Sequence, residues 1–339
     1  MENKKISIND IAKHLNIAKS TVSLIINGKA DERRISKELQ AKVLDYVREV
    51  RFYPHHLAQS LATGRSSSIG LIVEDISDSF FGPIALMIEN LAKTKGYRIM
   101  YSSTLGDTNT AIEMINFFRR SHLDGYIIAP TKGIENIVKE MVDEHTPIVL
   151  FDRDPVDGVD FVGTNNREAM TEACMHLYDR GFRNIGFVTL ESAQSQMQDR
   201  LLGYKETMEK LAIDPKVAYI SFENKKAIKQ QLIKDFLESN PELDAIIFAT
   251  NYLCLAGLTA INELNTSTKM NFGIVSFDDH EAFNLISPAI TAIRQPLEEL
   301  SNNIISLLLK QIERPIRDNP SHVVIPSVMK ERGSSERKT

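Results

Sequence analysis

The sequence predicts an α/β protein: an N-terminal helix-turn-helix head, a hinge segment, and a two-lobed body of doubly wound parallel sheets. Three observations predict this fold class. Three short amphipathic helical segments fill the first 52 residues, short apolar runs then alternate with helical stretches, and this alternation starts again near residue 184. The 339 residues also exceed one ordinary core, since a domain averages about 150 residues.

The head begins with a short helix that Ser7 can cap, with Asp10 three residues later. Asn16 marks a tight turn, because Asn tolerates the left-handed backbone conformation better than most residues. A second helix is expected over about 18–27, and a third begins after Ser36. Three such helices form a small DNA-reading head, although any short helical hairpin shares part of this pattern.

The second helix is expected to bury Val22 and either Ile25 or Ile26. Its outer face then carries short hydroxyl side chains and one cation, at Lys19, Ser20, Thr21 and Ser23. Side chains of this kind suit a helix that enters the major groove of DNA.

Charge is unevenly distributed along the chain. Residues 1–65 hold 12 Lys and Arg against 7 Asp and Glu, whereas the remaining residues hold 28 against 38. A basic head on an acidic body is expected when only one end of a protein meets a polyanion.

The hinge segment, residues 53–66, contains a helical stretch of eight residues between Pro54 and Gly64. An isolated helix shorter than about 12 residues is marginal in water, so we expect it to be largely unfolded until it binds. Leu57 and Leu61 have no protein core of their own, and two copies over a minor groove would bury them. The alternative is a linker with incidental helicity.

The body, residues 67–339, alternates strands and helices twice. Strands are expected at 69–73, 98–103, 125–129, 147–151, 184–189, 217–222, 245–249 and 273–277. Helices are expected at 80–95, 108–121, 133–144, 166–180, 198–212, 225–239 and 252–264. We assign lobe one to about 67–163 plus 296–325 and lobe two to about 164–293, with a ligand cleft between the lobes that closes like a hinge.

Polar residues gather where the predicted strands end. Such residues are suited to binding a sugar. Its vicinal hydroxyls need paired acceptors and forked donors, and its ring face packs on an aromatic side chain. The residues expected to serve these roles are Phe81 for stacking, Asp152 and Asp278 as acceptors, and Arg200 and Asn251 as donors. Each of these assignments has a structural alternative. Asp152 could serve merely to end a strand, and Asp279 could serve merely to cap a helix. Phe80 and Phe81 could both be core residues.

Enzyme signatures are missing from the sequence. It has no glycine-rich phosphate loop after a strand, no GxSxG and no HExxH. A carboxylate-metal hydrolase built on Asp278, Asp279 and His280 is disfavoured, because consecutive residues at a strand end point to opposite sides. Cys174 and Cys254 are far apart and are expected to be small buried hydrophobes.

Two stretches resemble the lactose-repressor/galactose-repressor family of bacterial transcription regulators: Ser7 through Gly28, and "FYPHHLAQSLATGRSSSIGLIVEDISDSFFG" from Phe52. The resemblance covers nearly the whole chain and implies a periplasmic-binding-protein-like (type I) body. It implies that Lys19 and Ser20 lead the recognition helix, that Thr21 and Ser23 hold phosphates and that Leu61 is the intercalating hinge leucine. The full set of expected DNA contacts is Ser7, Lys19, Ser20, Thr21, Ser23, Leu24, Asn27, His55 and Leu61. The expected effector contacts are Phe81, Asp152, Arg153, Gln196, Arg200, Asn251 and Asp278, with Gln194 and Phe222 as further candidates.

Some positions depart from the family pattern. Leu24 stands where the family often has a base-reading arginine, which favours contact with a thymine methyl group. Thr164, Asn165 and Asn166 replace a usual Asp-Asn pair, and Tyr252 replaces an Asp, so the ligand is not expected to be a common hexose. Arg153 could instead lock a carboxylate within the sheet. The tail lacks a leucine heptad, which favours a dimer over a tetramer.

These observations predict a dimeric, sequence-specific DNA-binding regulator, a repressor, controlled by a sugar or sugar acid bound between two lobes. Its DNA partner is expected to be a palindromic operator. No cofactor, metal, membrane contact or catalytic residue is predicted. The N-terminus has no apolar run typical of a secretory signal, so we expect a cytoplasmic protein rather than a periplasmic solute-binding protein.

Overall fold

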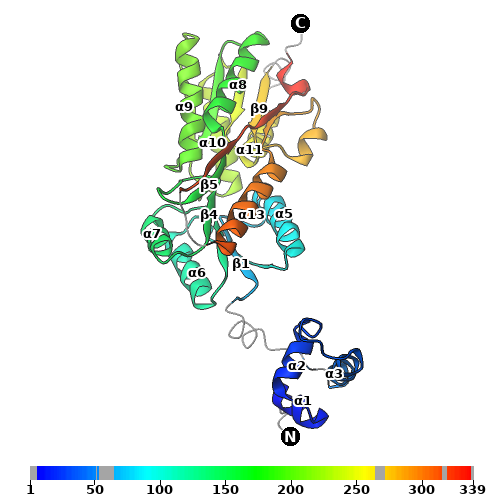
Figure 1. Cartoon of the computed structure of the whole chain (residues 1–339). Helices are drawn as coiled ribbons and strands as arrows, with labels where there is room; N and C mark the ends of the chain where they lie inside the picture. Colours follow the sequence, from blue (N-terminus) through cyan, green and yellow to red (C-terminus); the bar gives the residue numbers. More distant parts are fainter. Residues whose placement is uncertain (1–5, 51, 53–64, 264–271, 315–318, 337–339) are drawn as a thin grey trace. The chain divides into compact units, whose positions relative to one another are not determined.

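The computed structural model describes residues 6–50, 52, 65–263, 272–314 and 319–336. The chain divides into two compact units, Met1–Ser67 and Ser68–Thr339. The first unit is the helical head and the second is the body (Figure 1). The predicted α/β fold class is confirmed. No helix among the described residues is both long and apolar enough to cross a membrane.

The head contains three helices, α1 (Ile8–Leu15), α2 (Lys19–Ile26) and α3 (Lys37–Glu49). Ser7 and Asp10 form a capping box at the start of α1, and Ser36 caps α3. Asn16 ends α1 with φ = 51°, in the left-handed region that its position in the turn requires. One small core joins the helices, with Ile11, Ala12, Val22, Ile25, Ala30 and Val43 buried. The three predicted head helices are therefore confirmed.

The predicted hinge helix lies outside the described residues, together with His55, Leu57 and Leu61. The described chain resumes at Arg65 and enters the first strand of the body at Ser68.

Lobe one is defined here by a six-stranded sheet of order β11-β5-β4-β3-β1-β2, in which every pair is parallel. Its strands are β1 (Ser68–Val73), β2 (Arg98–Ser103), β3 (Gly125–Ile128), β4 (Ile148–Phe151), β5 (Asp160–Thr164) and β11 (His322–Ile325). Helices α5 (Phe81–Thr94) and α13 (Leu297–Glu313) pack on one face, and α6 (Thr108–Arg120) and α7 (Glu135–Asp143) pack on the other (Figure 1). Continuous apolar runs such as Ile69–Val73 form β1 because both faces of the sheet are covered.

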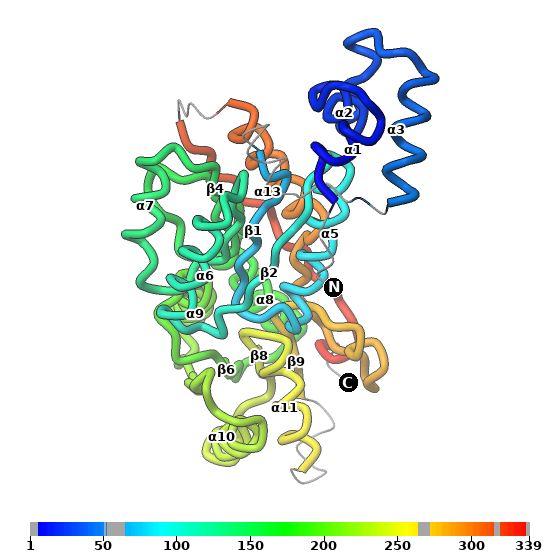
Figure 2. Tube along the Cα trace, turned by 90° about the horizontal axis from the view of Figure 1, so that it is seen from below, coloured from blue at the N-terminus to red at the C-terminus, as the bar shows by residue number. Residues whose placement is uncertain are grey.

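Lobe two is defined by the second sheet, of order β12-β10-β9-β8-β6-β7, in which only the pair β12 and β10 is antiparallel. Its strands are β6 (Ile185–Leu190), β7 (Lys216–Ile220), β8 (Ala245–Phe248), β9 (Gly273–Phe277), β10 (Thr291–Arg294) and β12 (Val328–Lys330). Its helices are α8 (Asn166–Asp179), α9 (Ser195–Lys210), α10 (Lys226–Ser239) and α11 (Asn251–Glu263), and two 3-10 turns are η1 (Glu281–Asn284) and η2 (Gly333–Ser335). Helices α8 and α9 pack against each other, as do α10 and α11 (Figure 2).

The strands and helices expected from 69 to 264 are present, and their observed ends differ from the predicted ends by up to three residues. No strand was predicted for β5, β10, β11 or β12, and no helix for α13. β11 and β12 mix buried and exposed positions, which leaves little apolar pattern to detect. Length does not explain why β5 and β10 were missed, because the four-residue strands β3, β4 and β8 were predicted. The sheet of lobe two also takes in β12, beyond the end expected for that lobe at 293.

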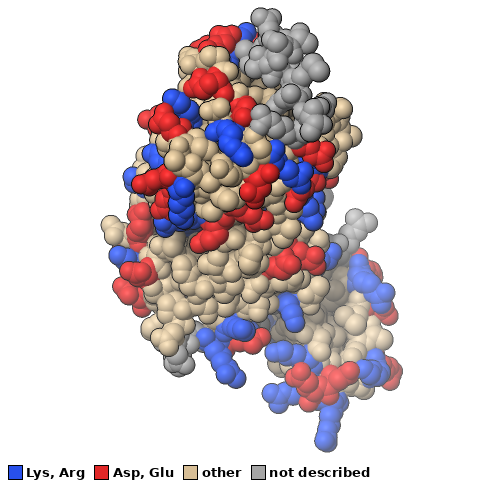
Figure 3. All heavy atoms as spheres, turned by 90° about the horizontal axis from the view of Figure 1, so that it is seen from above, with Lys and Arg blue, Asp and Glu red and all other residues tan. Residues whose placement is uncertain are grey.

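The surface charge of the body is mixed. Figure 3 shows Lys and Arg side chains interspersed with Asp and Glu side chains on the face drawn, without one continuous area of either sign. The excess of acidic residues in the body is therefore a property of its total charge and does not mark one patch on this face.

Candidate functional site

One face of α2 carries four of the nine predicted DNA contacts. Val22 and Ile25 are buried in the head core, which leaves Ser20, Ser23, Leu24 and Asn27 on a stripe at i, i+3, i+4 and i+7. Ser20 is exposed and the other three are half-buried. The Asn27 Nδ2 donates a hydrogen bond to the Ser23 Oγ at 3.2 Å, so the two side chains support each other on this face.

The N-terminus of α2 is suited to an anion. Its N-cap residue, Ala18, provides no side-chain acceptor, and no acidic residue lies in the first turn. The exposed cation of Lys19 lies there instead, although a cation at a helix N-terminus is unfavourable without a negative partner. A phosphate would satisfy both the first N–H groups and Lys19. Thr21 is half-buried next to this terminus, and Ser7 is exposed but uses its hydroxyl to donate to Asp10 Oδ2 at 2.6 Å.

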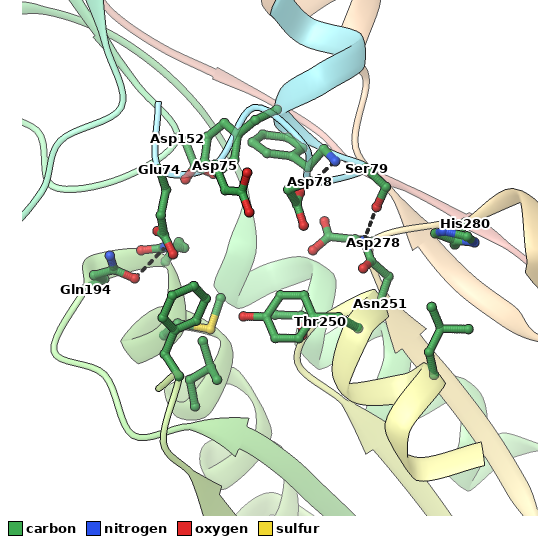
Figure 4. A pocket seen from close by; sticks show the side chains of 18 of the residues that line it. Glu74, Asp75, Asp78, Ser79, Asp152, Gln194, Thr250, Asn251, Asp278 and His280 are labelled. Atoms are coloured by element: carbon green, nitrogen blue, oxygen red, sulfur yellow. Dashed lines mark hydrogen bonds between the residues drawn. The ribbon is translucent and has the colours of Figure 1, made fainter. Parts of the chain in front are cut away.

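A cavity of about 510 Å³ lies between the two lobes of the body. Figure 4 shows Glu74, Asp75 and Asp78 entering it from the loop after β1, opposite Asn251 and Asp278. The cavity brings together all seven predicted effector contacts: Phe81, Asp152, Arg153, Gln196, Arg200, Asn251 and Asp278. Gln194 and Phe222 line it as well. Its volume is in the range of small-molecule sites, which span about 300 to 1,000 Å³.

Arg200 is fixed at the floor of the cavity, with 2% of its surface exposed. Its Nε donates to Asn166 Oδ1 at 2.8 Å, and its Nη1 donates to the Ala249 carbonyl at 2.7 Å and to Asp278 Oδ2 at 3.4 Å. The guanidinium also lies 3.6 Å from the ring centroid of Phe277. A guanidinium fixed in this way presents its remaining donors in one orientation.

Asp278 accepts a hydrogen bond from the Gln295 Nε2 at 2.6 Å, in addition to the one from Arg200. Its backbone is in the left-handed region, with φ = 66°, which turns the side chain out of the strand direction and into the cavity. Burial raises the pKa of Asp278 even though Arg200 and Gln295 lower it. A ligand hydroxyl that donates to this carboxylate would replace part of the lost solvation.

Asp279 does not cap a helix, which corrects one of the alternatives considered above. It pairs with Arg332 at 2.9 Å and Arg294 at 2.9 Å, while His280 is the N-cap of η1. Burial alone would raise the pKa of Asp279, but the hydrogen bonds and charges of the two arginines lower it overall. Asp278 and Asp279 thus turn to different partners, as expected for consecutive residues after a strand.

Arg153 forms ion pairs with Glu74 and with Asp152, the latter at 2.7 Å. Its guanidinium lies 5.3 Å from the ring centroid of Phe81. Burial would lower the pKa of Arg153, but the two carboxylates outweigh it and keep the side chain charged. Arg153 therefore lines the cavity and also holds two carboxylates at the sheet edge. Phe81 is likewise a core residue that reaches the cavity wall.

Two polar contacts join the lobes across the cleft. The Asn251 Nδ2 donates to the Ser79 Oγ at 2.9 Å, and the dashed line in Figure 4 marks this bond. Asp154 and Ser195 form two hydrogen bonds, of 2.7 Å and 2.9 Å. These contacts hold the two lobes together across the cleft.

Hydrogen bonds also link the cavity to the three segments where the chain crosses between the lobes. The Thr164 Oγ1 donates to the Gln295 Oε1 at 3.2 Å, and the Gln295 amide reaches Asp278. The Asn166 that holds Arg200 donates to the Thr164 carbonyl at 3.3 Å. The Ser327 backbone N–H donates to Asn165 Oδ1 at 2.8 Å. The positions that depart from the family pattern, 164–166, therefore lie at these crossings.

Several cavity residues were missed by the sequence analysis. They include Glu74, Asp75, Asp78, Ser79, Lys226, Lys229, His280 and Gln295, whereas Tyr252, singled out above as a departure from the family pattern, does line the cavity. The acidic residues follow β1 directly, so the rule that ligands bind beyond the carboxyl ends of strands could have found them. Gln295 follows a four-residue strand that gave no recognisable signal.

Known proteins resemble both the whole chain and its body. Residues 174–335 match the family model of a periplasmic binding protein-like domain. The chain is 27% identical over 339 residues to a ribose operon repressor from Halalkalibacterium halodurans, with 97% of this chain and 99% of that protein covered. It is 29% identical over 312 residues to the HTH-type transcriptional regulator KdgR of Bacillus subtilis, with 91% of each covered. Among solved structures, a LacI-family transcriptional regulator from Silicibacter pomeroyi has a similar fold, with a TM-score of 0.81, 18% identity, and 98% of this chain and 100% of that chain covered.

Proposed function

Since this chain belongs to the lactose-repressor/galactose-repressor family of bacterial transcription regulators, we propose that it is a repressor. Its head binds a specific DNA operator, and a sugar or sugar derivative bound between its lobes controls that binding. We propose no catalytic role. A cytoplasmic location and a homodimer follow from this proposal, because a two-fold symmetric operator needs two heads.

The observation that carries the effector part is the cavity between the lobes, where Arg200, Asn251 and Asp278 converge from three different elements of lobe two. Arg200 provides forked donors and Asp278 a buried acceptor, and this pairing suits vicinal hydroxyls. Phe81 gives an aromatic surface on the facing lobe. The arrangement binds a small polar ring in one orientation.

The DNA part rests on the outer stripe of α2 and on the uncapped start of that helix. We propose that Ser20, Ser23, Leu24 and Asn27 face base edges, while Lys19 and Thr21 contact phosphates. Ser7 lies at the start of α1, and its hydroxyl would contact a phosphate by exchanging its bond to Asp10 for one to the phosphate oxygen.

The effector acts on the angle between the lobes. A ligand that bridges the lobes favours the closed arrangement, and two of the three crossing segments are hydrogen-bonded, through Asn166 and Gln295, to the proposed ligand contacts Arg200 and Asp278. Closure then sets the spacing of the two hinge segments of a dimer. A coupling of about 1 to 3 kcal/mol would regulate DNA binding 5- to 150-fold.

Selection from a pool of random double-stranded DNA tests the proposal with the full-length protein. We expect enrichment of a two-fold symmetric sequence, whose binding constant falls linearly with salt on a logarithmic scale. A thermal-shift screen of sugars, sugar acids and nucleosides then identifies effectors as compounds that raise the melting temperature. Failure to enrich any sequence, with binding indifferent to salt, would refute the DNA-binding function.

A further inference from the structure

The two walls of the cavity carry opposite charges. Arg153 pairs with both Glu74 and Asp152, which leaves one formal negative charge among these three side chains, and Asp278 has Arg200 beside it. Two carboxylates of lobe one, Asp75 and Asp78, remain on one wall, and two lysines of α10, Lys226 and Lys229, remain on the other. Among the described residues, no ion pair within 4.0 Å joins either lysine to a carboxylate.

The Lys229 ammonium is held by one hydrogen bond, and its other N–H donors are available to a ligand. Its Nζ donates to the Phe222 carbonyl at 2.8 Å and lies 5.2 Å and 5.4 Å from the ring centroids of Phe222 and Tyr252. An ammonium has three N–H donors, so two are left for a ligand. Burial lowers the pKa of Lys229. An anion at this position would therefore compensate a cation that the fold itself leaves uncompensated.

Lys226 adds a second cation in the same corner. It lies three residues before Lys229, on the same face of α10, and is exposed at the edge of the cavity. Both are in the first turns of the helix, which has no acidic residue in its first turn and no side-chain cap at Lys225. The positive end of the helix dipole therefore adds to the charge of the two ammonium groups.

The remaining cavity groups call for hydroxyl donors. Gln196 is 3% exposed and lines the cavity, and its Oε1 is a buried acceptor without a hydrogen-bond partner among the described residues, so a ligand hydroxyl can satisfy it only when the side chain turns toward the cavity. Buried acceptors of this kind are rare because each costs free energy until a donor satisfies it. Asp278 is a further acceptor. A ligand with hydroxyl donors at one end and a negative group at the other would satisfy the acceptors Gln196 and Asp278 with its hydroxyls and the two lysines with its charge.

We propose that the effector is an anionic sugar derivative whose carboxylate or phosphate binds Lys226 and Lys229. Its hydroxyls bind the Arg200 and Asp278 side, and its ring lies beside Tyr252 and Phe222. The assignment rests on the proposed effector function of this cavity and narrows the ligand class from sugars in general to sugars that carry a negative charge.

Matched ligand series test the proposal on the full-length protein. Calorimetric titration and thermal shift would compare ribose, ribonate and ribose 5-phosphate, and glucose, gluconate and glucose 6-phosphate, with inorganic phosphate alone as a further probe. We expect an anionic member to bind at least tenfold more tightly than its neutral parent. Sugar acids that bind without sugar phosphates identify a carboxylate ligand, and the reverse identifies a phosphate ligand.

Charge-removing variants locate the anion. Lys226→Gln with Lys229→Gln is expected to lower the affinity for the anionic member at least tenfold and to leave that for the neutral parent within twofold. The matched control is Lys225→Gln, which removes a charge from the same helix end but outside the cavity lining. The proposal is overturned if no anion in either series binds, if neutral parents bind as tightly as their acids and phosphates, or if the control loses as much affinity as the double variant. Operator binding measured on the same samples separates these outcomes, because it persists when only the ligand class is wrong and is absent when the regulator function is wrong.

Discussion

Replacing Gln295 by methionine, which has a similar volume, tests whether the hydrogen bonds at the lobe crossings stabilise the closed body. Gln295 is 5% exposed; its amide donates to Asp278 Oδ1 at 2.6 Å and accepts from Thr164 at 3.2 Å. A hydrogen bond to a charged group contributes about 1.5 to 3 kcal/mol, and a neutral one about 1 kcal/mol. We therefore expect the free energy of unfolding of the body to fall by about 2 to 4 kcal/mol at pH 7, or about 4 to 12 °C in melting temperature.

The pH dependence of this loss distinguishes a bond to an ionised carboxylate from a packing defect. The pKa of Asp278 is raised in the folded protein, so its contribution to stability is greatest below the unfolded pKa and is lost as pH rises through the folded pKa. Gln295 stabilises the ionised form, so the loss in Gln295→Met should shrink as the pH is lowered and Asp278 is protonated. Urea unfolding from pH 7 to pH 4 measures it.

Gln311→Met provides a control with another buried glutamine. Gln311 bonds Ile148 and Asp160 within lobe one, so its replacement should destabilise the body without changing effector affinity. Gln295→Met should weaken effector binding as well, because Asp278 lines the cavity. A loss below about 0.5 kcal/mol, typical of surface substitutions, or a loss that grows as the pH falls, would refute the reasoning.

Three further outcomes are expected. Lys19→Ala should weaken operator binding uniformly across sequences and lower the salt slope by about one unit in fluorescence anisotropy, which a base-specific loss would contradict. Asp78→Asn should raise the melting temperature at pH 7, because burial and the charge of Asp278 raise the pKa of Asp78 and so disfavour its ionised form. This gain in melting temperature should vanish as the pH falls and Asp78 is protonated in the parent protein. A lower melting temperature at pH 7 would refute this. Arg332→Gln should cost about 1 to 3 kcal/mol in urea unfolding at pH 7, and less as the pH falls through the lowered pKa of Asp279; equal losses at pH 7 and pH 3 would exclude this pairing as the cause.

Several residues that line the cavity were predicted from the sequence. Arg200, Asn251 and Asp278 were found because each is close to the end of an apolar strand or the start of the following helix, and parallel strands place those positions at one edge. The head helices were predicted because Ser7 and Ser36 occupy positions where a hydroxyl caps a helix.

Other features could not be predicted because they depend on long-range pairing. Asp279 pairs with Arg332, 53 residues away, and nothing in a strand-end aspartate distinguishes this from a helix cap. Gln295 bonds a threonine 131 residues away, and the lysines at the start of α10 resemble a solvated helix end in the sequence. Their roles arise from contacts between segments that are far apart in the sequence, which local patterns do not encode.

The path from the cavity to the head begins in one strand. The loop with Asp75 and Asp78 follows β1 directly, and the start of β1 at Ser68 follows the hinge segment. β1 is paired in register with β2 and β3 on both sides and both of its faces are covered, so it moves with lobe one as a rigid element. A ligand therefore reaches the hinge by rotating lobe one against lobe two, and this rotation must break or form the Asn251–Ser79 bond across the cleft. Asn251→Ala should accordingly change operator affinity even without effector, whereas a signal transmitted along β1 alone would leave it unchanged.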